Sequence, residues 1–483
     1  SGDRILVLKW AYDLNLFDLG PRRWDVAVFK NPSDGQANYI KRIVGLPGEV
    51  LEVIDGNVYA AAIDDLKQKE PGLVEALDAL RLQVARQRTA SIRPTTGHGG
   101  MGYERPDLMA EFERLNKRLL PHLRIQRKTR LAQESLWIEV YNHDYCPPGQ
   151  PGNRPLSPVR WVPLGQAAEQ AWNTSRPEIV FAAESDEPLA IRFEGKPIRD
   201  YMAYNFSQML GRQDDGNNPV GDVRLQFTVI PDGGDGSIRL RINRDLDTFM
   251  AEVAMDGTVS LDHLCTDLPG GRQNIGQARL QPFARGQAVS LILANVDYRV
   301  ALEVDGREVL WTSDQQYRPN LKRGIEISYD GDRLIQPTQV EIAARRLTGR
   351  LRHLRLDRDV YYRSLRQDER PAHGPENAYL GWPGWGTAGC PIMLRSDRVV
   401  DGKFYFGEYF MLGDNSPASK DSRRWWELGP HLVQLGDEYQ LGTVPGDQLI
   451  GRAFFVYWPA GYRPSWAANL GLIPNVGRMR WIR

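Results

Sequence analysis

Short apolar runs separated by glycine, proline and aspartate make up most of this sequence, and they restrict it to a mainly β fold. Near the start these runs are GDRILVLKW, DVAVFK, NYIKRIVGL and VLEVIDGNVYA. In the middle of the chain, VRLQFTVIP, SIRLRINRD, AVSLILANV and YRVALEVDG are separated by PDGGDG, MDG and VDG. β-branched and aromatic residues favour extended backbone, and many short strands between turn residues are typical of a β-sandwich. We therefore predict strands at 2–60 and a β-sandwich at 178–362.

One region departs from this pattern and has the spacing of helices. Two sets of apolar residues recur every three or four positions, which places each set on one face of an amphipathic helix. These are Leu73, Leu77, Leu80 and Val84, followed by Leu108, Phe112, Leu115 and Leu119. The breaker-rich stretch SIRPTTGHGGMGYERP lies between them. We expect an antiparallel helical hairpin within residues 61–146.

Proline- and glycine-rich stretches indicate where one part of the chain gives way to the next. PPGQPGNRPLSP and ERPAHGPENAYLGWPGWG are of this kind, and strands resume after the second with KFYFGEYFML. The expected parts are a first half-core at 1–60, the hairpin at 61–146, a linker at 147–177, the sandwich at 178–362, a linker at 363–399, a second half-core at 400–459 and a tail at 460–483.

Charge and composition exclude several classes of protein. Lys+Arg and Asp+Glu both number 61, which argues against a nucleic-acid-binding protein that neutralises phosphates in bulk. No stretch approaches the roughly 18 consecutive apolar residues that span a bilayer. The three cysteines form no C-x-x-C pair, and the seven histidines lack metal-ligand spacing. PDGGDG at 231–236 lacks the later glutamate of an EF-hand loop, so we expect a hairpin turn there, and neither a metal nor a cofactor in this chain.

Lys41 is a candidate for lysine chemistry. In NYIKRIVG the period of two places Tyr39, Lys41 and Ile43 on one face of a strand. An ammonium among apolar neighbours is disfavoured, so its pKa falls from about 10.4 toward neutrality, where lysine can act as a base and arginine cannot. The chain has 11 lysines against 50 arginines, so a lysine at this position is informative. The alternative is a lysine that reaches along the sheet to solvent.

Two separated groups of segments resemble one family. The first is GDRILVLKWAY, RWDVAVFKNP and NYIKRIVGLPGE, and the second is GEYFMLGDNSPASKDSRRWW and VPGDQLIGRAFFVYWP. Together they resemble the conserved boxes of type I signal peptidases, the Ser/Lys membrane proteases that remove leader peptides from exported proteins. The resemblance implies a protease-like β core built from 1–60 and 400–459, with the hairpin and the sandwich inserted between the halves.

The resemblance also implies roles for individual residues. Lys41 would be the general base, and Ser419 would orient its amine without adding charge. Four further residues would brace the site as ion pairs, and two would contact the substrate. The bracing residues are Arg42 with Asp414 and Asp421 with Arg423, and the substrate contacts are Tyr39 and Ile40. No cofactor is needed, and the implied partners are signal peptides of exported preproteins and a membrane surface on the extracytoplasmic (periplasmic) side.

The sequence departs from the family where it begins. The family's nucleophilic serine lies in a Ser-Met-x-Pro-Thr box that starts eight residues before the Gly-Asp matched by Gly2 and Asp3, and this sequence has only Ser1 there. Arg23-Trp24-Asp25 replaces an Arg-Gly-Asp, and Ser-Pro-Ala at 416–418 replaces a frequent Arg-Asp-Asn. We expect a soluble fragment of a membrane-anchored peptidase, inactive as given because the nucleophile is absent.

A second reading comes from another class of protein. RVALEVDGREVLW resembles the laminin-G and concanavalin-like jelly rolls. The alternative is therefore a non-catalytic carbohydrate- or protein-binding protein that uses the jelly roll, with an unidentified ligand, on a protease-like scaffold. The fold alone does not name that ligand.

Three structural expectations follow from the protease reading. The Lys41 amine should lie within hydrogen-bond reach of the Ser419 hydroxyl, and 1–60 and 400–459 should pair in one sheet. The core should also keep aromatic side chains for the lipid–water interface, with about half of the candidate rings packed inside instead. These candidates are Trp10, Tyr12, Phe17, Trp425, Trp426, Phe454, Phe455 and Trp458.

Overall fold

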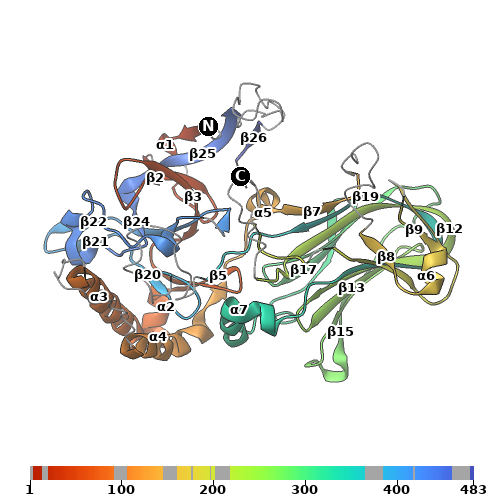
Figure 1. The fold of residues 1–483 in the computed structure, drawn as a ribbon, viewed down its shortest axis with the longest axis horizontal. Helices are drawn as coiled ribbons and strands as arrows, with labels where there is room; N and C mark the ends of the chain where they lie inside the picture. The colour runs from red at the N-terminus through yellow and green to blue at the C-terminus, as the bar shows by residue number, and fades with distance from the viewer. Residues whose placement is uncertain are drawn as a thin grey trace, which may run out of the picture. The chain divides into compact units, whose positions relative to one another are not determined.

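The computed structural model is mainly β, as predicted, and divides into two compact units (Figure 1). It describes residues 4–13, 20–91, 106–144, 160–175, 178–195, 197–201, 218–364, 384–416, 419–458 and 479–482. The first unit contains Ser1–Leu136, Leu321–Tyr329 and Tyr361–Arg483, and the second contains Trp137–Asn320 and Asp330–Val360. No helix within the described residues is long and apolar enough to cross a membrane.

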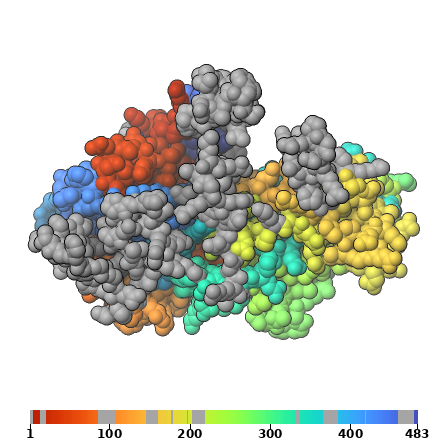
Figure 2. Space-filling view, viewed as in Figure 1, coloured from red at the N-terminus to blue at the C-terminus, as the bar shows by residue number. Residues whose placement is uncertain are grey.

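The main sheet of the first unit is assembled from both ends of the chain, which confirms the expected pairing. Its strands run in the order β1-β25-β2-β3-β23-β24, all antiparallel, and β26 pairs with β25. In the space-filling view the blue C-terminal residues lie next to the red N-terminal ones (Figure 2). The bounds are β1 (Arg4–Leu8), β2 (Val26–Lys30), β3 (Asn38–Gly45), β23 (Glu408–Leu412), β24 (Val444–Pro445), β25 (Leu449–Trp458) and β26 (Arg480–Trp481).

The apolar residues of this sheet form the core that supports β3. Phe29, Ile43, Met411 and Trp425 are fully buried and pack together, with Tyr39 partly buried against them. Short helices α1 (Trp10–Asp13), α2 (Ile63–Lys69) and α5 (Arg130–Leu136) flank the strands of this unit. A second sheet of the unit has the order β20-β4-β5-β6, with β20 (Ile392–Leu394), β4 (Glu49–Ile54), β5 (Asn57–Ala62) and β6 (Arg124–Ile125). A two-stranded ribbon pairs β21 (Arg398–Val400) with β22 (Lys403–Tyr405).

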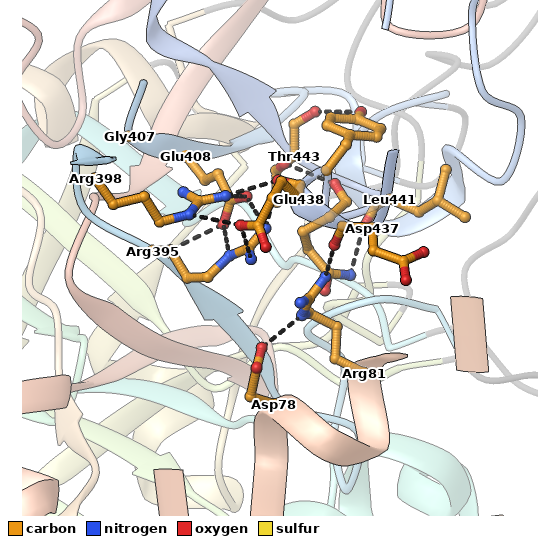
Figure 3. Close-up of polar contacts among 12 residues, drawn as sticks. Asp78, Arg81, Arg395, Arg398, Gly407, Glu408, Asp437, Glu438, Leu441 and Thr443 are labelled. Atoms are coloured by element: carbon orange, nitrogen blue, oxygen red, sulfur yellow. Dashed lines mark hydrogen bonds and ion pairs between the residues drawn. The ribbon is translucent and has the colours of Figure 1, made fainter. Parts of the chain in front are cut away.

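The helical hairpin is present as α3 (Leu73–Ser91) and α4 (Pro106–Leu119). The eight apolar residues chosen from their spacing are all buried, so the period of 3.6 identified the packed faces correctly. Arg81 links α3 to the second half-core at 400–459. It donates to Asp78 in the same helix at 2.8 Å and to the Asp437 carbonyl at 2.9 Å (Figure 3). The hairpin is therefore attached to the core by a side chain as well as by apolar packing.

Next to Arg81, a network of ion pairs holds the start of β23 (Figure 3). Arg395 binds the buried carboxylate of Glu408 at 2.7 Å and reaches Glu438 at 3.0 Å. Arg398 donates to the same Glu438 carboxylate at 3.0 Å. Because Glu408 is the first residue of β23, this network fixes the strand that leads into the Gly-Asp-Asn triplet at 413–415.

The second unit is a β-sandwich whose two sheets share two long strands, β12 (Val223–Arg244) and β19 (Val340–Arg358). One end of β12 pairs with β16 and the other with β13, while β19 pairs along its whole length. The sheets face each other, because Tyr141 of β7 contacts Phe193 of β11 with ring centroids 5.6 Å apart. The other strands are β7 (Ile138–Asn142), β8 (Trp161–Pro163), β9 (Trp172–Asn173), β10 (Ile179–Ala183), β11 (Leu189–Phe193), β13 (Asp247–Ala254), β14 (Thr258–Leu264), β15 (Arg272–Arg279), β16 (Val289–Val296), β17 (Arg299–Val304) and β18 (Arg307–Trp311).

The prediction of a hairpin turn at 231–236 is wrong. The PDGGDG stretch stays within β12, paired with β19, and its register shifts mark the place where the strand passes from one sheet to the other. A side chain at Gly236 would overlap the carbonyl of Arg345, and Gly234 has φ +97°. Glycine is therefore required by the close approach of β19 and not by a reversal of the chain.

Two further ranges differ from their expected structure. Residues 160–175, expected to be linker, carry β8, α6 (Gln166–Ala171) and β9, which extend the sandwich, while 145–159 lie outside the described residues. Within the range expected to be all strand, Leu321–Leu334 forms helix α7. Its Gly324, Ile327 and Ser328 are buried at helical spacing, and the Ser328 hydroxyl accepts from the Asp55 backbone N–H at 2.7 Å in the first unit. The spacing signal was present but was obscured by the YDG tripeptide, which is typical of turns.

Candidate active site

Lys41 and Ser419 meet in the first unit. Lys41 lies on the central strand β3, and its Nζ donates to the Ser419 Oγ at 2.9 Å, across 378 positions of sequence. Ser419 is buried, and the lysine is half-buried. The expected contact is therefore present, and the alternative of a lysine extended into solvent does not describe this structure.

The surroundings of Lys41 favour its neutral amine. Burial lowers the pKa of Lys41, and it outweighs the nearby carboxylates Asp421 and Asp414, which act in the opposite direction. Arg423 adds to the lowering. Because Asp421 and Arg423 largely balance each other as charges, desolvation of the amine decides the direction of the shift.

Asp421 and Arg423 form a buried ion pair beneath the site. Arg423 donates to both carboxylate oxygens of Asp421, at 2.9 and 2.7 Å, and both residues are at most 1% exposed. Burial alone would raise the pKa of Asp421, but Arg423 and the Gly413 N–H outweigh it and lower that pKa. Arg423 also donates to Ser416 Oγ at 3.0 Å. The pair therefore braces the 3₁₀ turn Ser422–Arg424 against the loop that carries Ser419.

Arg42 and Asp414 form the second expected ion pair. Arg42 Nε and Nη2 donate to the two carboxylate oxygens of Asp414 at 2.9 and 2.8 Å, a bidentate geometry. Arg42 Nη1 also donates to the Trp24 carbonyl at 2.7 Å. Trp24 has φ +75°, the left-handed region in which glycine is the ordinary residue. This is the position where the family pattern has glycine, so the departure places a tryptophan in a glycine conformation.

Gly413 was not among the residues singled out from the sequence, yet the site depends on it. A Cβ at this position would overlap Ser419 Oγ and would lie 3.2 Å from Lys41 Nζ. The Gly413 N–H also donates to Asp421 at 3.0 Å. The GDN triplet was a visible signal, but its glycine has the spacing of any turn residue, so only the structure reveals the close approach.

The comparisons with known proteins concern these same segments. Residues 1–98 and 396–458 match the model of the family described as signal peptidase, peptidase S26. Signal peptidase I of Pseudomonas fluorescens is 50% identical over 58 residues, which cover 10% of this chain and 20% of that relative. Signal peptidase I of Pseudomonas aeruginosa is 40% identical over 86 residues, covering 15% of this chain and 29% of the relative.

Both ends of the chain match signal peptidases. The chain spans less than a third of the length of these two curated relatives. The matched ranges include Lys41, Ser419 and both ion pairs, so the contacts of the candidate active site lie within the signal-peptidase-like core.

The chain also has low-scoring likenesses to solved structures. The carbohydrate-binding module CBM66 from Bacillus subtilis has a TM-score of 0.27 at 12% identity, covering 41% of this chain and 96% of that one. The laminarinase from Rhodothermus marinus has a TM-score of 0.29 at 13% identity, covering 46% and 98%. Similarity at this level assigns neither a ligand nor an activity to this chain.

The two residues expected to contact substrate differ in their surroundings. Ile40 is 42% exposed on β3, whereas Tyr39 packs against Phe29 and Trp425 in the core beneath the site. Ile40 is therefore available for contact with a substrate, whereas Tyr39 packs in the core that supports β3. Among the described residues, the two groups that could hold a metal ion lie in the second unit, and neither includes Asp414 or Asp421.

Proposed function

We propose that the signal-peptidase-like core is the catalytic part of a leader peptidase in which Lys41 is the general base. The observation that carries this proposal is the half-buried Lys41 amine held 2.9 Å from the Ser419 hydroxyl. A base must be neutral to accept a proton, and burial favours the neutral amine. A serine hydroxyl adds no charge, so it can hold the amine in place without restoring the cation.

The reaction we propose is acyl transfer from a leader peptide to serine and then to water. The Lys41 amine accepts the proton of the attacking serine hydroxyl and returns it to the leaving amine of the mature protein. In the family pattern that serine stands upstream of the positions matched by Gly2 and Asp3, and the base Lys41 and its supports lie downstream of them.

The substrates we propose are signal peptides of exported preproteins, with Ile40 among the contacting residues and small side chains preferred at the cleavage site. We place the site on the extracytoplasmic side of a membrane to which the parent protein is anchored. Aromatic residues near β1 and β25 support contact with that membrane, since Trp10, Trp458 and Trp481 are 51%, 41% and 61% exposed. Trp425 is instead fully buried, and Phe17 lies outside the described residues.

The membrane contact has a direct test. Co-sedimentation with anionic liposomes is compared between this chain and a variant with Trp10, Trp458 and Trp481 replaced by serine. We expect the chain to sediment with vesicles and the variant to remain in the supernatant. Equal sedimentation of both proteins, or of neither, would contradict the assignment.

The role of Lys41 is tested first by titration of the chain itself. Reductive methylation with ¹³C-formaldehyde labels every lysine amine, and the Lys41 signal is identified by its absence in Lys41→Met. We expect this signal to titrate at a lower pH than those of the other lysines. A Lys41 signal that titrates with the exposed lysines would refute the base assignment.

The activity is tested in the protein produced from its full coding sequence in membranes, with a preprotein as substrate. General base catalysis is worth about 10²- to 10⁴-fold, so Lys41→Met should lower kcat/KM by that factor. The matched control is Lys67→Met, an exposed lysine of the same unit, which should cleave as the wild type does. Cleavage that survives Lys41→Met would refute the mechanism.

A further inference from the structure

We propose that Asp247, His263 and Cys265 form a binding site for a zinc ion in the second unit. Each residue offers one ligand atom, and these three atoms all lie within 4.8 Å of one another. The site is separate from the signal-peptidase-like core, since all three residues belong to the second unit.

The strand geometry brings the three side chains together. His263 lies on β14 and Cys265 two positions later, so a period of two places both on the same face. Phe249 of β13 is the register partner of His263, and Asp247 therefore falls beside Cys265 on the neighbouring strand. A hairpin with this register presents ligands from two strands at one point, which a search for C-x-x-C or H-x-x-x-H spacing does not detect.

The present contacts hold the ligand atoms near the positions that a metal requires. His263 Nε2 lies 2.6 Å from Asp247 Oδ1, and the Cys265 thiol donates to the same carboxylate. Zinc ligands at 2.0–2.3 Å in a tetrahedron lie about 3.3–3.8 Å apart, so the carboxylate need only open away from the imidazole. Asp247 is 28% exposed and has room to do so, whereas His263 is 5% exposed and stacks on Phe249 with ring centroids 4.5 Å apart.

The charges and the outer contacts also suit zinc. A thiolate and a carboxylate supply two negative charges, which neutralise Zn²⁺ when the histidine is neutral. Arg244, the register partner of Asp247, is engaged in an ion pair with Asp222 and so leaves the Asp247 charge for the metal. The Asp267 backbone N–H donates to the Cys265 sulfur, an outer contact that stabilises a metal-bound thiolate.

Binding must release protons. In the absence of the metal the Cys265 thiol donates its proton to the Asp247 carboxylate. On binding, the S–H proton passes to solvent, and His263 must present the lone pair of Nε2 to the metal. Three protein ligands leave the fourth tetrahedral position to a water molecule or another small ligand.

The test uses the whole chain and cobalt(II) as a spectroscopic substitute for zinc. We expect one equivalent of Co²⁺ to produce visible bands of tetrahedral cobalt and a thiolate-to-cobalt charge-transfer band, all lost on addition of one equivalent of Zn²⁺. Cys265→Ser should lose the charge-transfer band, and His263→Gln should lose tetrahedral binding. No cobalt spectrum in the wild type, or a charge-transfer band that persists in Cys265→Ser, would overturn the proposal.

Two control variants and one measurement without mutation complete the design. Cys390→Ser removes a buried thiol of the other unit. His353→Gln removes an exposed histidine that pairs with Asp144 at 2.8 Å and belongs to neither group of possible metal ligands among the described residues. Both variants should bind cobalt as the wild type does. In the wild type, Zn²⁺ should protect Cys265 from iodoacetamide, measured by peptide mass spectrometry. Alkylation of Cys265 at an unchanged rate would count against the site even if a variant failed to fold.

Discussion

Replacing Glu52 with glutamine should stabilise the first unit at neutral and alkaline pH. Glu52 lies on β4 and is fully buried, where its carboxyl accepts from the Gly389 backbone N–H and from Asn116 Nδ2. Among the described residues, the other Glu52 oxygen and the Asn116 carbonyl oxygen have no partner. A glutamine amide can donate to that Asn116 oxygen while it keeps the bond from Gly389.

The magnitude follows from the pKa of the buried carboxyl. Burial raises the pKa of Glu52 from 4.5 to about 8, and the two hydrogen bonds only partly oppose it. The folded state therefore holds a proton that the unfolded chain loses above pH 4.5, so stability falls as the pH rises from 4.5 to 8. At 1.36 kcal/mol per pH unit, the loss amounts to about 3 kcal/mol by pH 7 and about 5 kcal/mol by pH 8. Glutamine has no proton to lose and avoids this loss.

The assay must report on the first unit alone, and Cys390 provides the probe. Its buried thiol follows Gly389 in sequence, so it becomes accessible when the Glu52 region opens. Protein is equilibrated in urea at pH 5, 7 and 8.5 and then pulsed with a thiol-specific reagent, and mass spectrometry quantifies Cys390 against Cys265 of the second unit. We expect Glu52→Gln and wild type to unfold at similar urea concentrations at pH 5 and to diverge as the pH rises.

The control is Glu75→Gln, an exposed carboxyl on α3, which should track the wild type at every pH. A difference between Glu52→Gln and wild type that is the same at pH 5 and pH 8.5 would show that Glu52 is ionised in the folded state, and the reasoning would fail.

Three further changes test the candidate active site. Lys41→Met should raise the free energy of unfolding at neutral pH. Burial lowers the pKa of Lys41, so protonating this amine costs free energy in the folded state but not in the unfolded chain. Urea titrations should show the gain in stability shrinking as the pH rises above the folded-state pKa of Lys41. Gly413→Ala should push the Ser419 hydroxyl away from the Lys41 amine, because the added Cβ would overlap Ser419 Oγ. The midpoint pH at which the Lys41 ¹³C signal titrates should therefore change, while far-UV circular dichroism stays unchanged. Asp421→Asn should destabilise the first unit by about 3–5 kcal/mol in urea, because it leaves Arg423 as an uncompensated buried charge, and Arg423→Met added to it should recover part of that loss.

The sequence predicted the features that rest on short-range patterns. The alternation in β3 identified Lys41 as lying on an apolar face, and the leucine spacing of α3 and α4 identified their buried sides. The pairing of the two chain ends followed from the resemblance of both segments to a single family, because no local pattern links residues so far apart. The same resemblance supplied Ser419, whose own neighbours are those of any surface turn.

The features that were missed depend on contacts between segments distant in sequence. The glycines of 231–236 have the composition of a turn, and only the passage of β19 beside β12 makes them part of a continuous strand. The contact of Gly413 with Ser419 also requires the folded loop. The grouping of Asp247 with His263 and Cys265 depends on strand register, which composition does not specify.

The assembly of the main sheet from both chain ends sets an order for its synthesis on the ribosome. β3 ends at Gly45 and its partner β23 begins at Glu408, so roughly 360 residues must be translated between them, which takes about 20 to 70 s at 5–20 residues per second. During that interval the edge of β3 that β23 later covers has unpaired backbone groups, a template for association with other chains. The second unit waits for less time, because its last strand, β19, ends at Arg358, before β23 is made. A nascent chain halted once β19 has left the ribosome, but before β23 is made, should therefore contain a protease-resistant sandwich and a first unit that still requires a chaperone.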